Sequence, residues 1–130
     1  MISSPSVRVE KYRRRMDVVL VGVVARDIEN HSLAALRGAL AAAGQRCAVV
    51  PFGGFAAMDA TLAAVLALAP RICGISLQTT EAMLATLAFT RLLRARGYAG
   101  TIVVGGHVAT LAADELLAAP AGIDVVRWIA

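Results

Sequence analysis

Five short apolar runs alternate with segments of helical periodicity along this 130-residue chain. Each run has the length of a strand, and its shortage of polar residues indicates burial on both faces of a sheet. The expected strands are Val18–Val24, Cys47–Val50, Ile72–Ile75, Thr101–Val104 and Asp124–Arg127. Strands that alternate with helices form right-handed βαβ units, and these units build a parallel sheet. The pattern therefore predicts an α/β fold around a doubly wound, five-stranded parallel sheet.

Capping and helix-breaking residues set the bounds of four helices between these strands. Asp59 and Thr80 are placed to cap the second and third helices, and the fourth is short, Ala112–Ala118. The residues expected to end the helices are Gly44, Pro70, Gly97 and Pro120. This arrangement is typical of a flavodoxin-like (Rossmann-like) sheet of order 2-1-3-4-5. Such sheets bind ligands beyond the carboxyl ends of the strands, where the order reverses between strands 1 and 3.

Hydrophobic residues make up 58% of the chain, and the mean hydropathy is +0.70. No stretch of about 18 apolar residues is free of charge, so we expect no membrane-spanning helix. A parallel sheet covered on both faces explains much of the excess. The other explanation is an exposed apolar patch that another domain or an identical subunit covers. Phe52, Phe55 and Leu77, near the expected ligand edge, are the candidates for that patch.

Five basic residues lie among the first fifteen positions, with Tyr12 as the one aromatic residue there. A nucleic-acid arm needs interleaved aromatic residues and a membrane arm needs an amphipathic helix. We therefore expect a solvated lead-in over residues 1–16, one domain over residues 17–130, and neither a nucleic-acid nor a membrane partner. No clear cleavage site follows the first apolar run, which argues against a signal peptide. Cys47 and Cys73 lie in expected strands, as small buried residues of a protein in the reducing cytoplasm.

The loops after the strands lack the motifs of several ligand-binding and catalytic classes. No GxGxxG or Walker sequence follows the first strand, which disfavours a dinucleotide or a nucleoside triphosphate. A phosphoacceptor receiver domain ends its third strand in Asp, whereas Ser76 follows that strand here. His31 and His107 have no triad partners at recognisable spacing, so we expect no catalytic residues and no metal ligands. A small hydrolytic site, in which both histidines hold a metal with Asp27 or Glu29, remains as a weakly specified alternative.

Four segments together point to a ligand. They are the Glu29-Asn30 pair and the segments Gly74–Thr80, Val104–Thr110 and Gly122–Arg127. In this order and spacing they resemble the cobalamin-binding domain, most closely the version at the N-terminus of cobalamin-dependent radical S-adenosylmethionine (SAM) enzymes. The resemblance covers about residues 17 to 127.

The resemblance implies a corrinoid held at the carboxyl edge of the sheet. In that family the serine after strand 3 contacts the nucleotide tail, and the glycine pair after strand 4 lets the tail pass close to the backbone. Ser76, Gly105 and Gly106 occupy these positions. A long amphipathic tail also needs a slot lined by small residues. The residues expected to bind the cofactor are Glu29, Asn30, His31, Ser76, Leu77, Gln78, Thr79, Gly105, Gly106, His107 and Thr110.

The loop after the first strand departs from one pattern of the family. Methionine-synthase-like members carry DxHxxG there, and the His replaces the tail base as the lower ligand of cobalt. Asp27 fits the first position, but Glu29 stands at the His position, Ser32 at the Gly position, and His31 comes two residues late. The resemblance therefore implies cobalamin, which we expect as methylcobalamin, in a base-off and His-off state.

The chain also lacks the CxxxCxxC motif that holds the iron–sulfur cluster of radical SAM enzymes. The resemblance implies that the cluster and SAM belong to a partner: a radical SAM domain or subunit, or another methyl-transferring protein. The expected function is to bind cobalamin and present it to that partner. The alternative is a flavodoxin-like domain without a ligand that serves a structural or regulatory interaction. Colour distinguishes the two, because a corrinoid protein is pink to orange.

Overall fold

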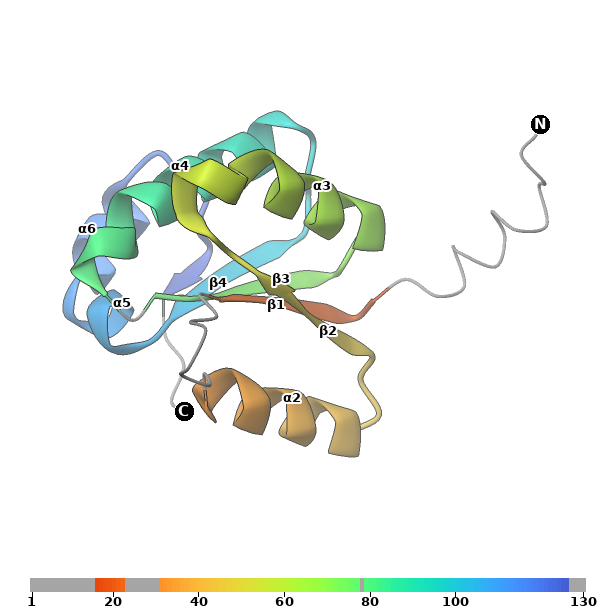
Figure 1. Ribbon diagram of the computed structural model, residues 1–130. Coiled ribbons are helices and arrows are strands. Elements are labelled where there is room, and N and C mark those ends of the chain that lie inside the picture. The colour runs from red at the N-terminus through yellow and green to blue at the C-terminus, as the bar shows by residue number, and fades with distance from the viewer. Residues whose placement is uncertain (1–15, 23–30, 78, 127–130) are drawn as a thin grey trace, which may run out of the picture.

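One parallel sheet organises the molecule (Figure 1). The computed structural model describes residues 16–22, 31–77 and 79–126. The sheet order is β2-β1-β3-β4-β5, which confirms the predicted α/β class and flavodoxin-like topology. All four neighbouring pairs are parallel. The strands are β1 (Val18–Gly22), β2 (Cys47–Pro51), β3 (Ile72–Ser76), β4 (Thr101–Gly105) and β5 (Val125–Val126).

Helices cover both faces of this sheet (Figure 1). One face carries α2 (His31–Ala42), and the other carries α3 (Met58–Leu68) and α4 (Met83–Ala95). Two short helices, α5 (His107–Leu111) and α6 (Ala113–Ala118), pack against β4 and β5 respectively. The 3-10 turns η1 (Gly54–Ala57) and η2 (Thr80–Ala82) lead into α3 and α4. Within the described residues, no helix combines the length and the hydrophobicity needed to cross a membrane.

The apolar strands supply two cores, because alternate residues of a strand point to opposite faces. Val19 and Val21 of β1 belong to the larger core, which includes Leu62 of α3 and Phe89 of α4. Val18 and Leu20 of the same strand pack with Leu33 of α2 in the smaller core. Burial on both faces explains why the runs that predicted the strands are continuously apolar.

The two predicted helix caps are wrong. The N-cap of α3 is Ala57, and no side chain bonds to the helix there. Asp59 lies inside the first turn of α3, and its carboxylate accepts a hydrogen bond from Arg96 at 3.1 Å. Thr80 begins η2 and Thr79 precedes it without a side-chain cap. Both helices are entered through a 3-10 turn, so the residue with a capping side chain does not fall at the helix boundary.

Several element boundaries also differ from the prediction. The helix expected around Ala112–Ala118 is confirmed as α6, and a further short helix, α5, precedes it from His107. The fifth strand has only two residues, and Asp124 precedes it with its carboxylate bonded to the backbone N–H of Ile102 at 2.8 Å. The described part of β1 is Val18–Gly22, and the predicted end at Val24 falls among residues 23–30, which lie outside the described part of the chain. The two thiols are free, as expected, although Cys47 is only half-buried.

Arg94 closes the amino edge of the sheet by joining three segments. Its Nη1 donates to the carbonyl oxygens of Tyr98 and Gly100 at 2.9 and 2.7 Å. Its Nε and Nη2 donate to the Gly122 carbonyl at 3.1 and 2.9 Å, and Nη2 also pairs with Asp124 at 2.7 Å. One side chain at the end of α4 therefore holds the α4–β4 loop and the approach to β5. The guanidinium has donors enough for this many bonds in a fixed fork.

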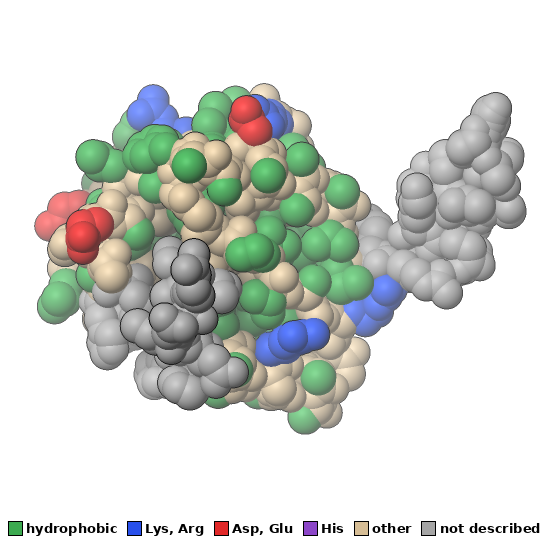
Figure 2. All heavy atoms as spheres, viewed as in Figure 1, with side chains coloured by type: hydrophobic (Ala, Val, Ile, Leu, Met, Phe, Trp, Pro, Cys, Tyr) green, Lys and Arg blue, Asp and Glu red, His purple; other side chains and the backbone are tan. Residues whose placement is uncertain are grey.

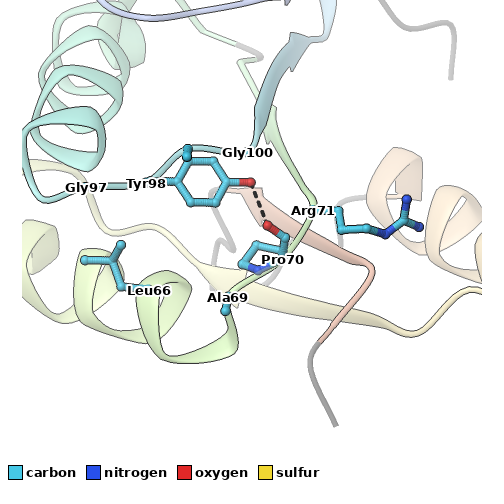
Figure 3. A pocket seen from close by; sticks show the side chains of 8 residues that line it. Leu66, Ala69, Pro70, Arg71, Gly97, Tyr98 and Gly100 are labelled. Carbon is cyan, nitrogen blue, oxygen red and sulfur yellow. Dashed lines mark hydrogen bonds between the residues drawn. The ribbon is translucent and has the colours of Figure 1, made fainter. Parts of the chain in front are cut away.

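Tyr98 also lies at the amino edge (Figure 3). Its hydroxyl donates to the Pro70 carbonyl at 2.9 Å, and both residues line a cleft of about 450 Å³ whose walls include Leu66 and Gly100. Gly100 has no room for a side chain, because a Cβ there would lie 2.7 Å from the Arg71 carbonyl. Burial is the main cause that raises the pKa of Tyr98 to about 12. Burial likewise raises the pKa of Cys73, in the adjoining strand, to about 12.

Candidate cofactor site at the carboxyl edge

The last residues of four strands form a row across the carboxyl edge of the sheet. Pro51 of β2 is in register with Gly22 of β1, Gly22 with Ser76 of β3, and Ser76 with Gly105 of β4. Gly22, Ser76 and Gly105 are the small members of the row, and they span the point where the strand order reverses. In open α/β sheets this switch point is where ligands bind. The register thus brings three of the smallest residues in the protein to the switch point, where a ligand would need space.

The row of small residues extends inward along one face. Gly74 lies two residues before Ser76 on β3, in register with Leu20 of β1 and Val103 of β4. Because side chains alternate along a strand, Gly74 and Ser76 lie on the face that Leu20 shares with α2. Ser76 is 4% exposed. On β3, this face is therefore bounded by backbone and one hydroxyl, with Leu20 of β1 and Val103 of β4 on either side of Gly74.

Two hydrogen bonds continue the strand ladder beyond its last residues. The N–H of Leu77 donates to the Gly105 carbonyl at 2.7 Å, and the N–H of Phe52 donates to the Gly22 carbonyl at 2.9 Å. Gly106 then turns the chain into α5 with φ 110° and ψ 176°, a conformation open to glycine alone. The edge is thus a regular row of strand ends, followed on β4 by a turn that requires glycine.

The structure gathers three of the sequence-predicted site residues here: Ser76, Gly105 and Gly106. Thr79 and Thr110 follow the same strand ends and are exposed, whereas the side chain of Leu77 is fully buried in the core. His31 and His107 are the first residues of α2 and α5. Glu29, Asn30 and Gln78 lie outside the described residues, as does Asp27 of the alternative metal site.

The predicted apolar patch is wrong for two of its three members. Phe52 is 3% exposed and stacks at a tilt on Phe89, with ring centroids 5.3 Å apart. Leu77 has no exposed surface, and only Phe55 is exposed, at 65%. Both errors have one cause. The residue that follows each strand continues the ladder, which turns its side chain into the core between the sheet and α3 and α4.

Gly22 was missed by the sequence reasoning, because an apolar run through Val24 placed it inside a strand. A usable signal was present. If the first apolar run is ended at Val21 and aligned with the run ends at Ile75 and Val104, then Gly22, Ser76 and Gly105 fall opposite one another. Small residues at matching positions of adjacent strands indicate a close approach by backbone or ligand.

The described segments that follow β2, β3 and β4 carry little charge. Glu81 is the only charged residue among them, namely among residues 52–57, 77, 79–82 and 106–112. The segment after β1, with Arg26, Asp27 and Glu29, lies outside the described residues. Among the side chains that the structure describes, no group of three His, Cys, Asp or Glu could hold a metal ion. Segments with so little charge suit an uncharged or amphipathic ligand more than a polyphosphate, which would need cations or a run of free N–H groups.

The family comparison decides the identity of that ligand. The family described as "B12 binding domain" matches residues 17–128, which is most of the chain. This chain belongs to the B12-binding domain family. No curated protein and no solved structure matches it.

The residues of this B12-binding domain fit cobalamin. The nucleotide tail of cobalamin is a long, slender and amphipathic chain, so it needs a slot that large side chains do not obstruct. Gly22, Gly74 and Gly105 place no side chain on this face, and the buried Ser76 adds one hydroxyl. A bulky residue at any of these four positions would stand in the middle of the face.

Proposed function

We propose that this B12-binding domain holds methylcobalamin at the carboxyl edge of its sheet and presents it to a radical SAM or other methyl-transferring partner. The observation that carries the proposal is the register of Gly22, Ser76 and Gly105 across β1, β3 and β4. It supports a tail that enters beside β4 and runs along the face shared with α2. Bound methylcobalamin supplies the transferable methyl group, while the protein binds and orients it.

Each residue of the site then has a separate task. Gly105 and Gly106 keep side chains away from the path of the tail, and Ser76 adds a small polar group in a buried position. Glu29, Asn30, Gln78 and Thr79 follow β1 and β3 in the sequence, and their proposed task is to contact the corrin ring or its amide groups.

We also propose that the protein provides no nitrogen ligand to the lower face of cobalt. Glu29 stands where a methionine-synthase-like member has its histidine, and His31 comes two residues later, at the start of α2. Electron paramagnetic resonance of the reduced cob(II)alamin form tests this state. The spectrum should lack resolved nitrogen splitting, and splitting that disappears in His31→Ala would contradict it.

The partner has to reach the same edge, because the substrate approaches the upper side of the corrin. Large apolar side chains on the segments after β2, β3 and β4 support this placement: Phe55, Leu84 and Leu111 are 65%, 71% and 86% exposed. Figure 2 shows hydrophobic side chains spread over the viewed surface, with few charged ones among them. A radical SAM domain that carries its own iron–sulfur cluster and SAM is the proposed occupant, and an identical subunit is the other.

Reconstitution with hydroxocobalamin tests the core of the proposal. The purified chain should retain an equimolar corrinoid through gel filtration and show the absorption spectrum of base-off cobalamin. A chain that stays colourless after reconstitution under refolding and native conditions would favour a ligand-free structural or regulatory domain. A base-on spectrum of the retained cofactor would leave binding intact and overturn the proposed tail position.

A further inference from the structure

The turn at Gly106 is held by a side chain as well as by the backbone. The Gly106 carbonyl accepts hydrogen bonds from both the N–H and the Oγ1 of Thr110, each at 3.0 Å. The preceding carbonyl, of Gly105, accepts from the N–H of Leu77 at 2.7 Å. Both carbonyls of the glycine pair are therefore engaged within the chain. A glycine at φ 110° has many other conformations available, so these bonds select one of them.

We propose that Thr110 is a positioning residue for the cofactor: its hydroxyl fixes the Gly105–Gly106 turn in the form that lets cobalamin approach β4. The inference rests on the proposed cobalamin-binding function. It assigns Thr110 to the support of the glycine turn rather than to contact with the ligand. The N–H bond of Thr110 belongs to the ordinary helical ladder, which any residue other than proline would make. The bond from Oγ1 is the one that depends on the side chain.

The hydrogen bond from Thr110 Oγ1 lies at the start of a very short helix. α5 has five residues, and a helix so short has little cohesion of its own. A second bond to the carbonyl at its start therefore stiffens the junction between β4 and the helix. Thr110 is exposed, so its hydroxyl would otherwise bond to water and contributes little to the net stability of the fold. The loss of Oγ1 should consequently appear in cofactor binding more than in stability.

Three variants of the full chain test the inference by titration with hydroxocobalamin. Thr110→Val removes the hydroxyl and keeps the branched shape, and Thr110→Ser keeps the hydroxyl. Thr90→Val is the matched control, because Thr90 Oγ1 makes the same kind of bond, to the Leu87 carbonyl at 3.0 Å on α4. Thr110→Val should raise the Kd for cobalamin about threefold to tenfold, which corresponds to the free energy of one hydrogen bond. Thr110→Ser and Thr90→Val should stay within about twofold of the unmodified chain.

Two results would overturn the positioning role: an unchanged Kd in Thr110→Val, or an equal loss in Thr110→Val and Thr110→Ser. An equal loss in Thr90→Val would also overturn it, because any lost helix hydroxyl would then have the same effect. Urea unfolding of the cofactor-free variants supplies the second measurement. A fall in stability in Thr110→Val large enough to explain the weaker binding would assign the residue to folding instead. Failure of the unmodified chain to bind cobalamin is a separate result, which refutes the proposed function itself.

Discussion

The two edges of the sheet differ in what fills them. At the amino edge, Arg94 alone donates to three backbone carbonyls and one carboxylate, and the Tyr98 hydroxyl adds a fourth carbonyl. At the carboxyl edge, the strand ends are Gly22, Ser76 and Gly105, which are among the smallest residues. Large side chains tie segments together beside the cleft at the amino edge, whereas small residues end the central strands at the carboxyl edge. Under the proposed function, stability and ligand binding are assigned to opposite ends of the same strands.

The largest expected effect is on the amino edge. Arg94→Ala should lower the free energy of unfolding by about 3 kcal/mol, because it removes five hydrogen bonds and leaves partly buried carbonyls unpaired. Arg96→Ala is the control, since Arg96 makes only an exposed pair with Asp59 and should cost under about 0.5 kcal/mol. Urea denaturation measures both. Equal losses in the two variants would remove the distinction between a network and a surface ion pair.

Alkaline pH should weaken the same edge. The folded chain keeps the Cys73 thiol and the Tyr98 hydroxyl protonated up to a pKa of about 12, above the ordinary values of 9.0 and 10.0. The folded state therefore binds more protons than the unfolded state as the pH rises, so stability falls from about pH 9 to pH 12. Cys73→Ala should flatten that fall.

Cys47→Ala is the control for this pH dependence. Burial raises the pKa of Cys47 as well, but Cys47 is only half-buried and lies on an edge strand. Cys47→Ala should therefore change the pH dependence of the unfolding free energy less than Cys73→Ala does. Unfolding free energies from urea titrations between pH 8 and pH 11 decide the comparison. A slope that Cys73→Ala leaves unaltered would contradict the role of the buried thiol.

A smaller effect on the free energy of unfolding is expected on α4, at a side chain that makes no hydrogen bond. The Thr86 hydroxyl is buried and has no hydrogen-bond partner among the residues that the structure describes, whereas the hydroxyl of Thr90, one turn further from the carboxyl edge, donates to the Leu87 carbonyl. Thr86→Val should raise the free energy of unfolding by about 1 kcal/mol, because it removes a buried group that lost its water on folding. Thr90→Val should give no gain. Calorimetric unfolding of the two variants compares them. A Thr86→Val variant that is less stable than the unmodified chain would show that the Thr86 hydroxyl stabilises the fold.

Sequence patterns were sufficient for the order of strands and for the place of the glycine loop. Continuous apolar runs identify buried parallel strands, and the glycine pair at 105–106 marks the end of the fourth run whatever its neighbours are. Residues whose role depends on a distant segment escaped prediction. Arg94 bonds to Gly122, 28 positions away, and its acceptors are backbone carbonyls, which leave no trace in side-chain identity.

The misplaced side chains have a related physical reason. Phe52 and Leu77 follow their strands by one residue, and a sequence reading that ends the strand early places them in exposed loops. In the structure the ladder continues by one more hydrogen bond, which turns both side chains inward. A one-residue change in strand length decides whether the next side chain follows the alternation of the strand or lies in a loop, so strand ends are where sequence patterns are least informative.

Cobalamin retention by glycine variants tests most directly the proposal that cobalamin binds at the carboxyl edge. Gly106→Val adds a branched side chain beside β4. Gly97→Val is the matched control, because Gly97 also has a positive φ, 98°, yet lies at the amino edge with open space around it. Ser76→Leu fills the row from the neighbouring strand without a change at a positive-φ position. Absorbance after gel filtration should show cobalamin bound to the unmodified chain and Gly97→Val, and absent from Gly106→Val and Ser76→Leu. Full retention of the cofactor by folded Gly106→Val and Ser76→Leu would contradict the proposed site.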